Sequence, residues 1–192
     1  PSPWGRLNTI TIAYGHGLSV TPLQLATATL PLVNGGFAVN PTFLPRTRAA
    51  GLKQSPSVLK PATSHSMLQL MRLNVLKGTG KRAEAEGYRV GGKTGTAEKV
   101  VGRSYEGSAL LNSFLATFPT DAPEYVVLVT IDEPKRVPGS HNEAPAGATG
   151  ATMKLSADTG PGLVTLSAVP VAENTSRSSK ATLPVLVTMA RP

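Results

Sequence analysis

Apolar residues in the first 80 positions recur at helical spacing. Thr21 and Pro22 form a typical helix start, since threonine caps the free amides of a first turn and proline is tolerated within it. Apolar side chains then return every three or four residues until Asn34 and the two glycines after it. A second such run covers residues 63–76 and ends at Gly78. The sequence therefore predicts two amphipathic helices with these core-facing side chains: Leu23, Ala26, Leu30, Val33, Met67, Leu70, Met71 and Val75.

The middle of the chain has the pattern of β-strands. Residues 88–100 carry β-branched side chains around several glycines, and residues 112–118 form a second extended stretch after a polar loop over 101–107. Residues 125–131 form a continuous apolar run, which is typical of a strand covered on both faces. The connections are short, and the one at 119–123 contains two prolines, which favours an antiparallel meander. The predicted fold class is α+β, an antiparallel sheet covered by helices.

Four other segments have weaker patterns. Residues 7–13 alternate enough to predict a short extended piece, and the proline-rich residues 37–60 predict irregular connections with short strands. A closing helix is expected somewhere within 148–158, although Gly150 weakens it. From residue 170 onward the serine, threonine and basic content is typical of a flexible tail.

Composition excludes some functions and leaves others open. The chain has 192 residues, a net charge of +8 and no cysteine, so it has no disulfide framework and no thiol nucleophile. Its basic residues lie in scattered pairs such as Lys81 and Arg82, and only 5% of residues are aromatic, which argues against nucleic-acid binding. His16, His65 and His141 are too far apart in sequence to predict a metal site. We therefore expect no metal and no cofactor, and we interpret the basic charge mostly as solvated surface.

The densest chemistry lies in residues 91–99, which combine lysines, two threonines and three glycines. A lysine ammonium has three donors, threonines add short hydroxyl groups, and glycines let another backbone come close. The segment is thus suited to an anionic, peptide-like ligand. Residues 87–94 also satisfy the phosphate-loop pattern of nucleotide-binding proteins. That alternative needs a buried strand before the first glycine and a helix from the lysine, whereas residues 77–86 are polar and Gly95 would interrupt the helix. A strand is favoured.

Two segments carry a resemblance to a known family. Residues 87–97 (Gly-Tyr-Arg-Val-Gly-Gly-Lys-Thr-Gly-Thr-Ala) closely resemble class B penicillin-binding proteins, the septal peptidoglycan D,D-transpeptidases of cell division. Residues 13–26 resemble the segment of that family that runs into a helix after its second motif. The resemblance covers roughly residues 4 to 165. It implies the C-terminal part of the penicillin-binding, serine β-lactamase-like transpeptidase fold over residues 1–169. Residues 170–192, whose composition predicts the flexible tail, lie outside the resemblance.

The resemblance also implies the roles of four residues. Lys93 projects its ammonium into the cleft, and Thr94 and Thr96 offer hydroxyls to the terminal carboxylate of the substrate. Gly95 leaves room for the stem peptide, and the backbone amide of Thr96 is one of two oxyanion donors. The expected catalytic residues are Lys93 and Thr96, and the expected substrate-binding residues are Thr94, Gly95 and Thr96. The implied partners are peptidoglycan stem peptides, β-lactam antibiotics and membrane proteins of the division complex, at the periplasmic face of the inner membrane.

The family's nucleophile is not found in this chain. Residues 57–60 match Ser-x-x-Lys and residues 140–142 match Ser-x-Asn, but only as letters. Pro56 and Pro61 bracket the first pair, which should start a buried helix, and the second lies after Lys93 although the family places it before. We interpret the chain as a fragment that holds half of an active site and is inactive alone. A non-catalytic scaffold or binding module of the same fold is the alternative.

Overall fold

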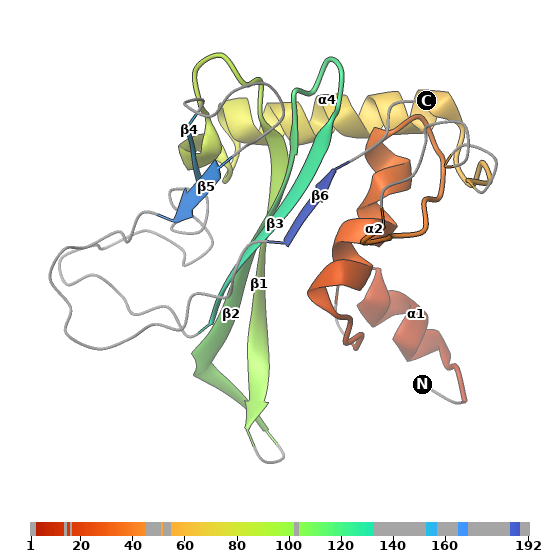
Figure 1. Cartoon of the computed structure of the whole chain (residues 1–192). Coiled ribbons are helices and arrows are strands. Elements are labelled where there is room, and N and C mark those ends of the chain that lie inside the picture. The colour runs from red at the N-terminus through yellow and green to blue at the C-terminus, as the bar shows by residue number, and fades with distance from the viewer. Residues whose placement is uncertain are drawn as a thin grey trace, which may run out of the picture.

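The computed structural model describes residues 3–13, 15, 17–44, 51, 55–101, 104–132, 153–156, 165–168 and 185–188. Its centre is a four-stranded antiparallel sheet in the order β1-β2-β3-β6, and β4 and β5 form a separate pair (Figure 1). The strands are β1 (Gly91–Val101), β2 (Ser104–Phe118), β3 (Tyr125–Asp132), β4 (Met153–Ser156), β5 (Thr165–Ala168) and β6 (Val185–Thr188). The helices are α1 (Arg6–Ile12), α2 (Pro22–Val33), α4 (Pro61–Lys77) and the 3₁₀ turn η1 (Lys81–Ala83). The predicted α+β class is confirmed.

Helix α2 begins and ends where the sequence predicts. The amide of Gln24 donates to Thr21 Oγ1 at 3.2 Å and the amide of Thr21 donates to Gln24 Oε1 at 2.8 Å, which is a capping box. At the other end, the side-chain oxygen of Asn34 accepts from the amides of Gly36 and Phe37. Of the predicted stripe, Ala26, Leu30 and Val33 are buried and Leu23 is half-buried.

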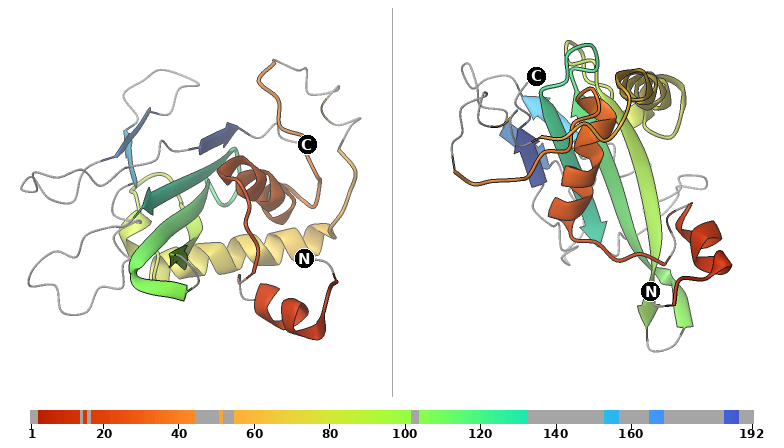
Figure 2. Two further views of the ribbon diagram at one scale, coloured as in Figure 1. Left: turned by 90° about the horizontal axis from the view of Figure 1, so that it is seen from below. Right: turned by 90° about the vertical axis from the view of Figure 1, so that its right-hand side faces the viewer.

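Helix α4 is slightly longer than predicted and covers less of the sheet. It starts with Pro61 in the first turn and ends at Gly78. Met71 and Val75 are buried, but Leu70 is 57% exposed, so its predicted place in the core is wrong. Successive helical residues are turned by about 100°, which points Leu70 away from the side that contacts the sheet. As Figures 1 and 2 show, α4 passes the β1 side of the sheet, while β6 lies at the opposite edge.

The sheet separates two apolar clusters, one on each face. Directly opposed residues share a face, and Lys93 pairs with Leu115, which pairs in turn with Leu128. One cluster joins the sheet to α4, η1 and the segment before β1: Val75, Ala83, Val90, Phe114, Ala116, Phe118, Val127 and Val129. The other joins it to α2 and α4: Ala26, Leu30, Val33, Met71 and Val126. The prediction that residues 125–131 are covered on both faces is confirmed.

Two local predictions were wrong. Residues 7–13 form α1 for the most part, not an extended piece. The period-three spacing of Leu7 and Ile10 suits a helix, and Thr11 donates to the carbonyl of Leu7. The predicted loop over 101–107 is largely strand, because Lys99 pairs with Glu106 beyond a bulge.

Residues 153–156, within the region predicted to hold a closing helix, pair with β5 as a strand. The remainder of that region lies outside the described residues. The division at residue 169 stays a prediction, and β6, which lies within the predicted tail, pairs with β3.

A buried serine ties the end of α2 to α4. Ser64 is 1% exposed, and its hydroxyl donates to the carbonyl of Leu32 while accepting from the amide of Gly35, each at 3.0 Å. Its partners lie at the C-terminal end of α2, where helical carbonyls and the following amides lack partners within the helix. This single hydroxyl therefore sets how α2 and α4 meet.

Removal of that hydroxyl should destabilise the fold. We expect Ser64→Ala to lower the free energy of unfolding by about 1–3 kcal/mol, because the carbonyl of Leu32 and the amide of Gly35, both in half-buried residues, would lose their partner. The matched control is Ser66→Ala, which removes an exposed hydroxyl bonded only within α4, to the carbonyl of Ala62. Thermal melting of the full-length protein that contains this chain compares the two. Equal melting temperatures for both variants would contradict the role given to Ser64.

Candidate functional site

The lysine-threonine-glycine segment lies on an edge strand. Lys93, Thr94, Gly95 and Thr96 all belong to β1, which pairs with β2 and has no other strand beside it among the described residues. A phosphate loop would require a helix beginning at Lys93, so the strand excludes the nucleotide-binding alternative. Lys93 and Thr96 are exposed, Gly95 is half-buried and Thr94 is only 7% exposed.

Three side-chain donors mark which backbone groups face the open edge of β1. The carbonyl of Val90 accepts from Arg72 Nη1 at 2.7 Å, that of Gly92 from Asn74 Nδ2 at 2.9 Å and that of Thr94 from Lys93 Nζ at 2.7 Å. In an antiparallel strand the backbone groups of alternate residues point to the same side. The amide and carbonyl of Thr96 therefore also face the open edge. This is the orientation that an oxyanion donor on β1 requires.

Glycines bring β1 close to its neighbours. A Cβ at Gly92 would come within 2.5 Å of Phe114 Cζ and 2.6 Å of the carbonyl of Leu115, and one at Gly95 would come within 2.6 Å of Ser113 Oγ. A contact under 3 Å to backbone cannot be relieved by a side-chain rotation, so Gly92 is fixed by packing. At Gly95 the crowding atom belongs to β2, and the role of this glycine in leaving room for a stem peptide stays a prediction.

The hydroxyl of Thr94 has a partner that sequence reasoning missed. Thr94 Oγ1 lies 2.6 Å from Thr79 Oγ1, and Thr79 is exposed in the turn after α4. The only signal in the sequence was a threonine between two glycines immediately after a helix. Thr94 therefore lies beneath Thr79, whereas Thr96 is exposed two residues further along β1. The roles predicted for these two hydroxyls stay predictions.

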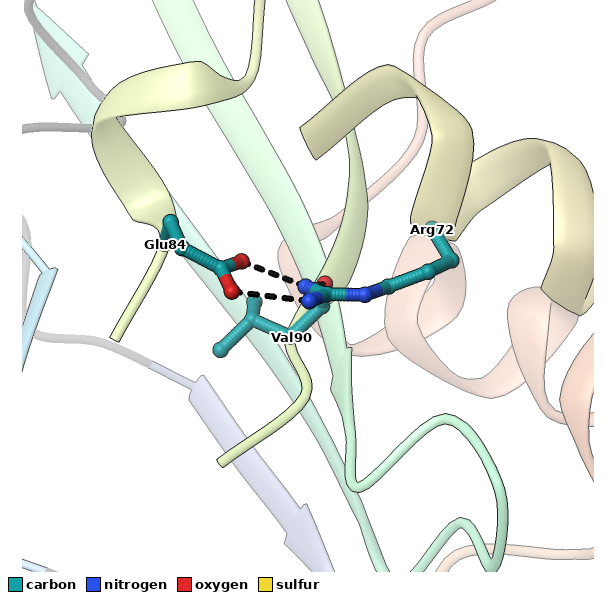
Figure 3. A network of polar contacts seen from close by, with 3 residues as sticks. All are labelled: Arg72, Glu84 and Val90. Atoms are coloured by element: carbon teal, nitrogen blue, oxygen red, sulfur yellow. Dashed lines mark hydrogen bonds and ion pairs between the residues drawn. The ribbon is translucent and has the colours of Figure 1, made fainter. Parts of the chain in front are cut away.

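An ion pair supports the segment that leads into β1. The guanidinium of Arg72 forms a bidentate contact with the carboxylate of Glu84 (Figure 3). Nη2 donates to Oε1 at 2.7 Å, and Nη1 donates to Oε2. Nη1 also donates to the carbonyl of Val90. The hydrogen bond from Arg72 lowers the pKa of Glu84, and the bond to Glu84 raises the pKa of Arg72. The pair thus joins α4, the end of η1 and the residue before β1.

The Ser-x-x-Lys match at residues 57–60 does not have the geometry of a nucleophile. Ser57 forms a β-bridge with Phe37, its hydroxyl donates to the carbonyl of Leu59, and Lys60 is the residue before α4. Ser57 and Lys60 therefore do not share a helical turn. This agrees with the interpretation that the match is accidental. His65 is exposed on α4 beside Gln69. The match at 140–142 and His16 lie outside the described residues, among which no three potential metal ligands gather.

The family model described as the penicillin binding protein transpeptidase domain matches residues 1–153. The chain belongs to this family. In this chain the edge strand that carries Lys93 follows the helices α1, α2 and α4. As in the sequence prediction, this strand opens an antiparallel meander.

Curated members of the transpeptidase family are similar over most of this chain. Identity is 39% over 144 residues to the probable peptidoglycan D,D-transpeptidase FtsI of Caulobacter vibrioides, covering 70% of this chain and 24% of that protein. It is 40% over 140 residues to the stage V sporulation protein D of Bacillus subtilis, covering 68% and 22%. The chain thus spans about a quarter of the length of these relatives.

A solved structure in the family supports the fold. The transpeptidase domain of penicillin-binding protein 3 from Burkholderia pseudomallei superposes with a TM-score of 0.66 at 33% identity, covering 78% of this chain and 44% of that one. The α+β arrangement described above is therefore the arrangement of a transpeptidase domain over the matched part. No motif indicated four residues that lie beside β1 or the segment before it, which are Arg72, Asn74, Thr79 and Glu84.

The Arg72–Glu84 pair should make stability depend on pH. Because the pKa of Glu84 is lowered in the folded state, its contribution is present above the unfolded value and is lost as pH falls through the folded value. The side chains are 20% and 41% exposed, so the contribution is about 1 kcal/mol or less. We expect the melting temperature of Glu84→Gln to lie below that of the unmodified protein at pH 7, and we expect the difference to shrink as the pH falls below the ordinary pKa of a glutamate.

Thermal melting at the two pH values checks this in the full-length protein. The exposed neighbour Glu86, changed to glutamine, is the matched control, and its melting temperature should follow that of the unmodified protein throughout. If the difference in melting temperature between Glu84→Gln and the unmodified protein stays constant down to pH 3, the ion pair does not cause that difference.

Proposed function

We propose that this chain is the C-terminal part of a peptidoglycan cross-linking D,D-transpeptidase of cell division. Such an enzyme acylates a serine with the penultimate D-Ala of a stem peptide, releases the terminal D-Ala, and transfers the acyl group to an amine of a neighbouring stem. The names of the relatives and the family model support this assignment. The observation that carries it is the edge of β1, where the ammonium of Lys93 and the amide of Thr96 lie on one short open stretch.

The chain would supply the clamp of the active site. Lys93 adds a positive charge that attracts the terminal carboxylate and can hydrogen-bond the serine of an upstream Ser-x-Asn element. The amide of Thr96 would stabilise the oxyanion of the tetrahedral intermediate, because a fixed donor gains most where negative charge develops. Thr94 and Thr96 would donate hydroxyl hydrogens to the carboxylate, which only accepts them. Gly95 would let the stem peptide approach the strand. β-Lactams would bind the same groups, as the family name implies.

The enzyme would work at the periplasmic face of the inner membrane with membrane proteins of the division complex, on an anionic polymer that suits the net charge of +8. None of the helices in the described residues is long and apolar enough to cross a membrane. A scaffold of the same fold without catalysis is the competing outcome, and acylation experiments separate the two.

The isolated 192-residue chain should not react with a fluorescent penicillin. Clamp and oxyanion groups cannot form an acyl bond without an activated serine, and Ser57 lacks a lysine on the same helical turn. The full-length protein should form a covalent adduct under the same conditions. Gel fluorescence and mass spectrometry check both, and an adduct on Ser57 would show that this serine is a nucleophile after all.

Lys93 should be essential for acylation in the full-length protein. We expect Lys93→Ala to lower the acylation rate constant by roughly 10²-fold or more, in the range typical of groups that assist proton transfer. Lys93→Arg should lose less, because it keeps the charge but replaces a compact head with a planar fork. Melting temperatures should change little, since the side chain is exposed. Stopped-flow acylation is the measurement, and an unchanged rate in well-folded Lys93→Ala would favour the scaffold.

A further inference from the structure

Asn74 connects three elements through four hydrogen bonds. Its side-chain amide donates to the carbonyl of Gly92 at 2.9 Å, and its side-chain oxygen accepts from Thr79 Oγ1 at 3.3 Å. Its backbone carbonyl accepts from the amides of Gly78 at 2.8 Å and Gly80 at 3.3 Å. The residue lies in the last turn of α4 and is half-buried. One asparagine therefore joins the helix, the turn over residues 78–80 and β1.

The turn is shaped around this side chain. A Cβ at Gly78 would come within 2.3 Å of Asn74 Oδ1 and 2.8 Å of the carbonyl of Asn74, and one at Gly80 within 3.1 Å of Nδ2. A Cβ does not fit at position 78, and at position 80 it would require small shifts of Asn74 and Val75. The turn consequently holds Thr79 against β1, with its hydroxyl 2.6 Å from that of Thr94.

The hydrogens of the two threonine hydroxyls follow from Asn74. A hydroxyl has one hydrogen to donate, and that of Thr79 goes to Asn74 Oδ1. Thr94 must then be the donor in the short contact between the two threonines. Asn74 Oδ1 itself is fixed as an acceptor, because the other end of the amide donates to Gly92. In this arrangement the hydrogen of Thr94 thus points toward Thr79.

A carboxylate on this edge would reverse the direction. It only accepts hydrogen bonds, so Thr94 must turn its hydrogen to the ligand, and Thr79 can then donate to Thr94. The bond that breaks is the 3.3 Å contact from Thr79 to Asn74, the longer of the two. The resulting chain polarises the hydroxyl of Thr94 and strengthens its bond to the charge. A hydroxyl at position 79 can accept from Thr94 in the first arrangement and donate to Thr94 when a carboxylate is bound. An apolar side chain can do neither.

We propose that Asn74 and Thr79 are positioning residues of β1. Asn74 acts through the carbonyl of Gly92, and Thr79 acts through the hydroxyl of Thr94. The inference rests on the proposed function, because the carboxylate it invokes is that of a stem peptide or a β-lactam. Neither residue needs to touch the ligand. Asn74 holds the backbone immediately before Lys93, and Thr79 sets the direction in which Thr94 donates.

The test measures stopped-flow acylation of the full-length protein by a fluorescent penicillin, alongside thermal melting. We expect Asn74→Ala to lower the second-order acylation constant about tenfold, or about 1.4 kcal/mol of transition-state stabilisation. Thr79→Val should lower it about fivefold, and Thr79→Ser should restore it to within about twofold. Ser64→Ala is the structural control: it should lower the melting temperature and leave the acylation constant within about twofold.

A double-mutant cycle shows whether Thr79 acts through Thr94. In a Thr94→Val background, Thr79→Val should not lower the acylation constant further, because the Thr94 hydroxyl that Thr79 positions is already absent. Additive losses, or acylation constants within twofold for both Asn74→Ala and Thr79→Val, would overturn the inference. Should Asn74→Ala fail to fold, the valine and serine variants at position 79 still decide it. A full-length protein that forms no penicillin adduct would instead refute the proposed function.

Discussion

The rest of the structure depends on one constraint, which is that β1 must be held firmly while one of its edges stays open. A strand paired on both sides is fixed by its neighbours, but an edge strand is hydrogen-bonded on one side and tends to accept another strand. Here β2 fixes one edge of β1, and side-chain donors from α4 bind the other edge at Val90 and Gly92. The remaining edge, at Thr94 and Thr96, faces outward.

Helices α2 and α4, which precede β1 in the chain, hold β1 in place through successive contacts. The capping box at Thr21 starts α2, whose buried stripe packs on β3 and on Met71 of α4. Ser64 then fixes the beginning of α4 against the end of α2, and the far end of the same helix carries Arg72 and Asn74. The buried contacts between α2 and α4 thus stabilise the helix from which Arg72 and Asn74 donate to the carbonyls of Val90 and Gly92.

Signals local in sequence predicted most of this fold, and contacts distant in sequence explain the failures. Thr21, Pro22 and Gly78 marked helix ends because capping depends on a few neighbouring residues. The core position of Leu70 was wrong because helical period alone does not say how much of a helix the sheet covers. Lys93 was found by its motif, but Thr79 and Asn74 were not, because the bonds from Thr79 to Thr94 and from Asn74 to Gly92 join residues 15 and 18 positions apart.

A lysine on an edge strand has a simple structural explanation, since charged side chains protect open edges from pairing with another sheet. Protection alone would not require the neighbouring pattern. The donors on the open edge take successive outward carbonyls at positions 90, 92 and 94, and no described side chain bonds the backbone of Thr96, the next outward residue. Among the described residues these donors end beside the exposed ammonium of Lys93 and leave the backbone of Thr96 without a side-chain partner, which is the arrangement expected if this edge binds an anionic peptide as proposed.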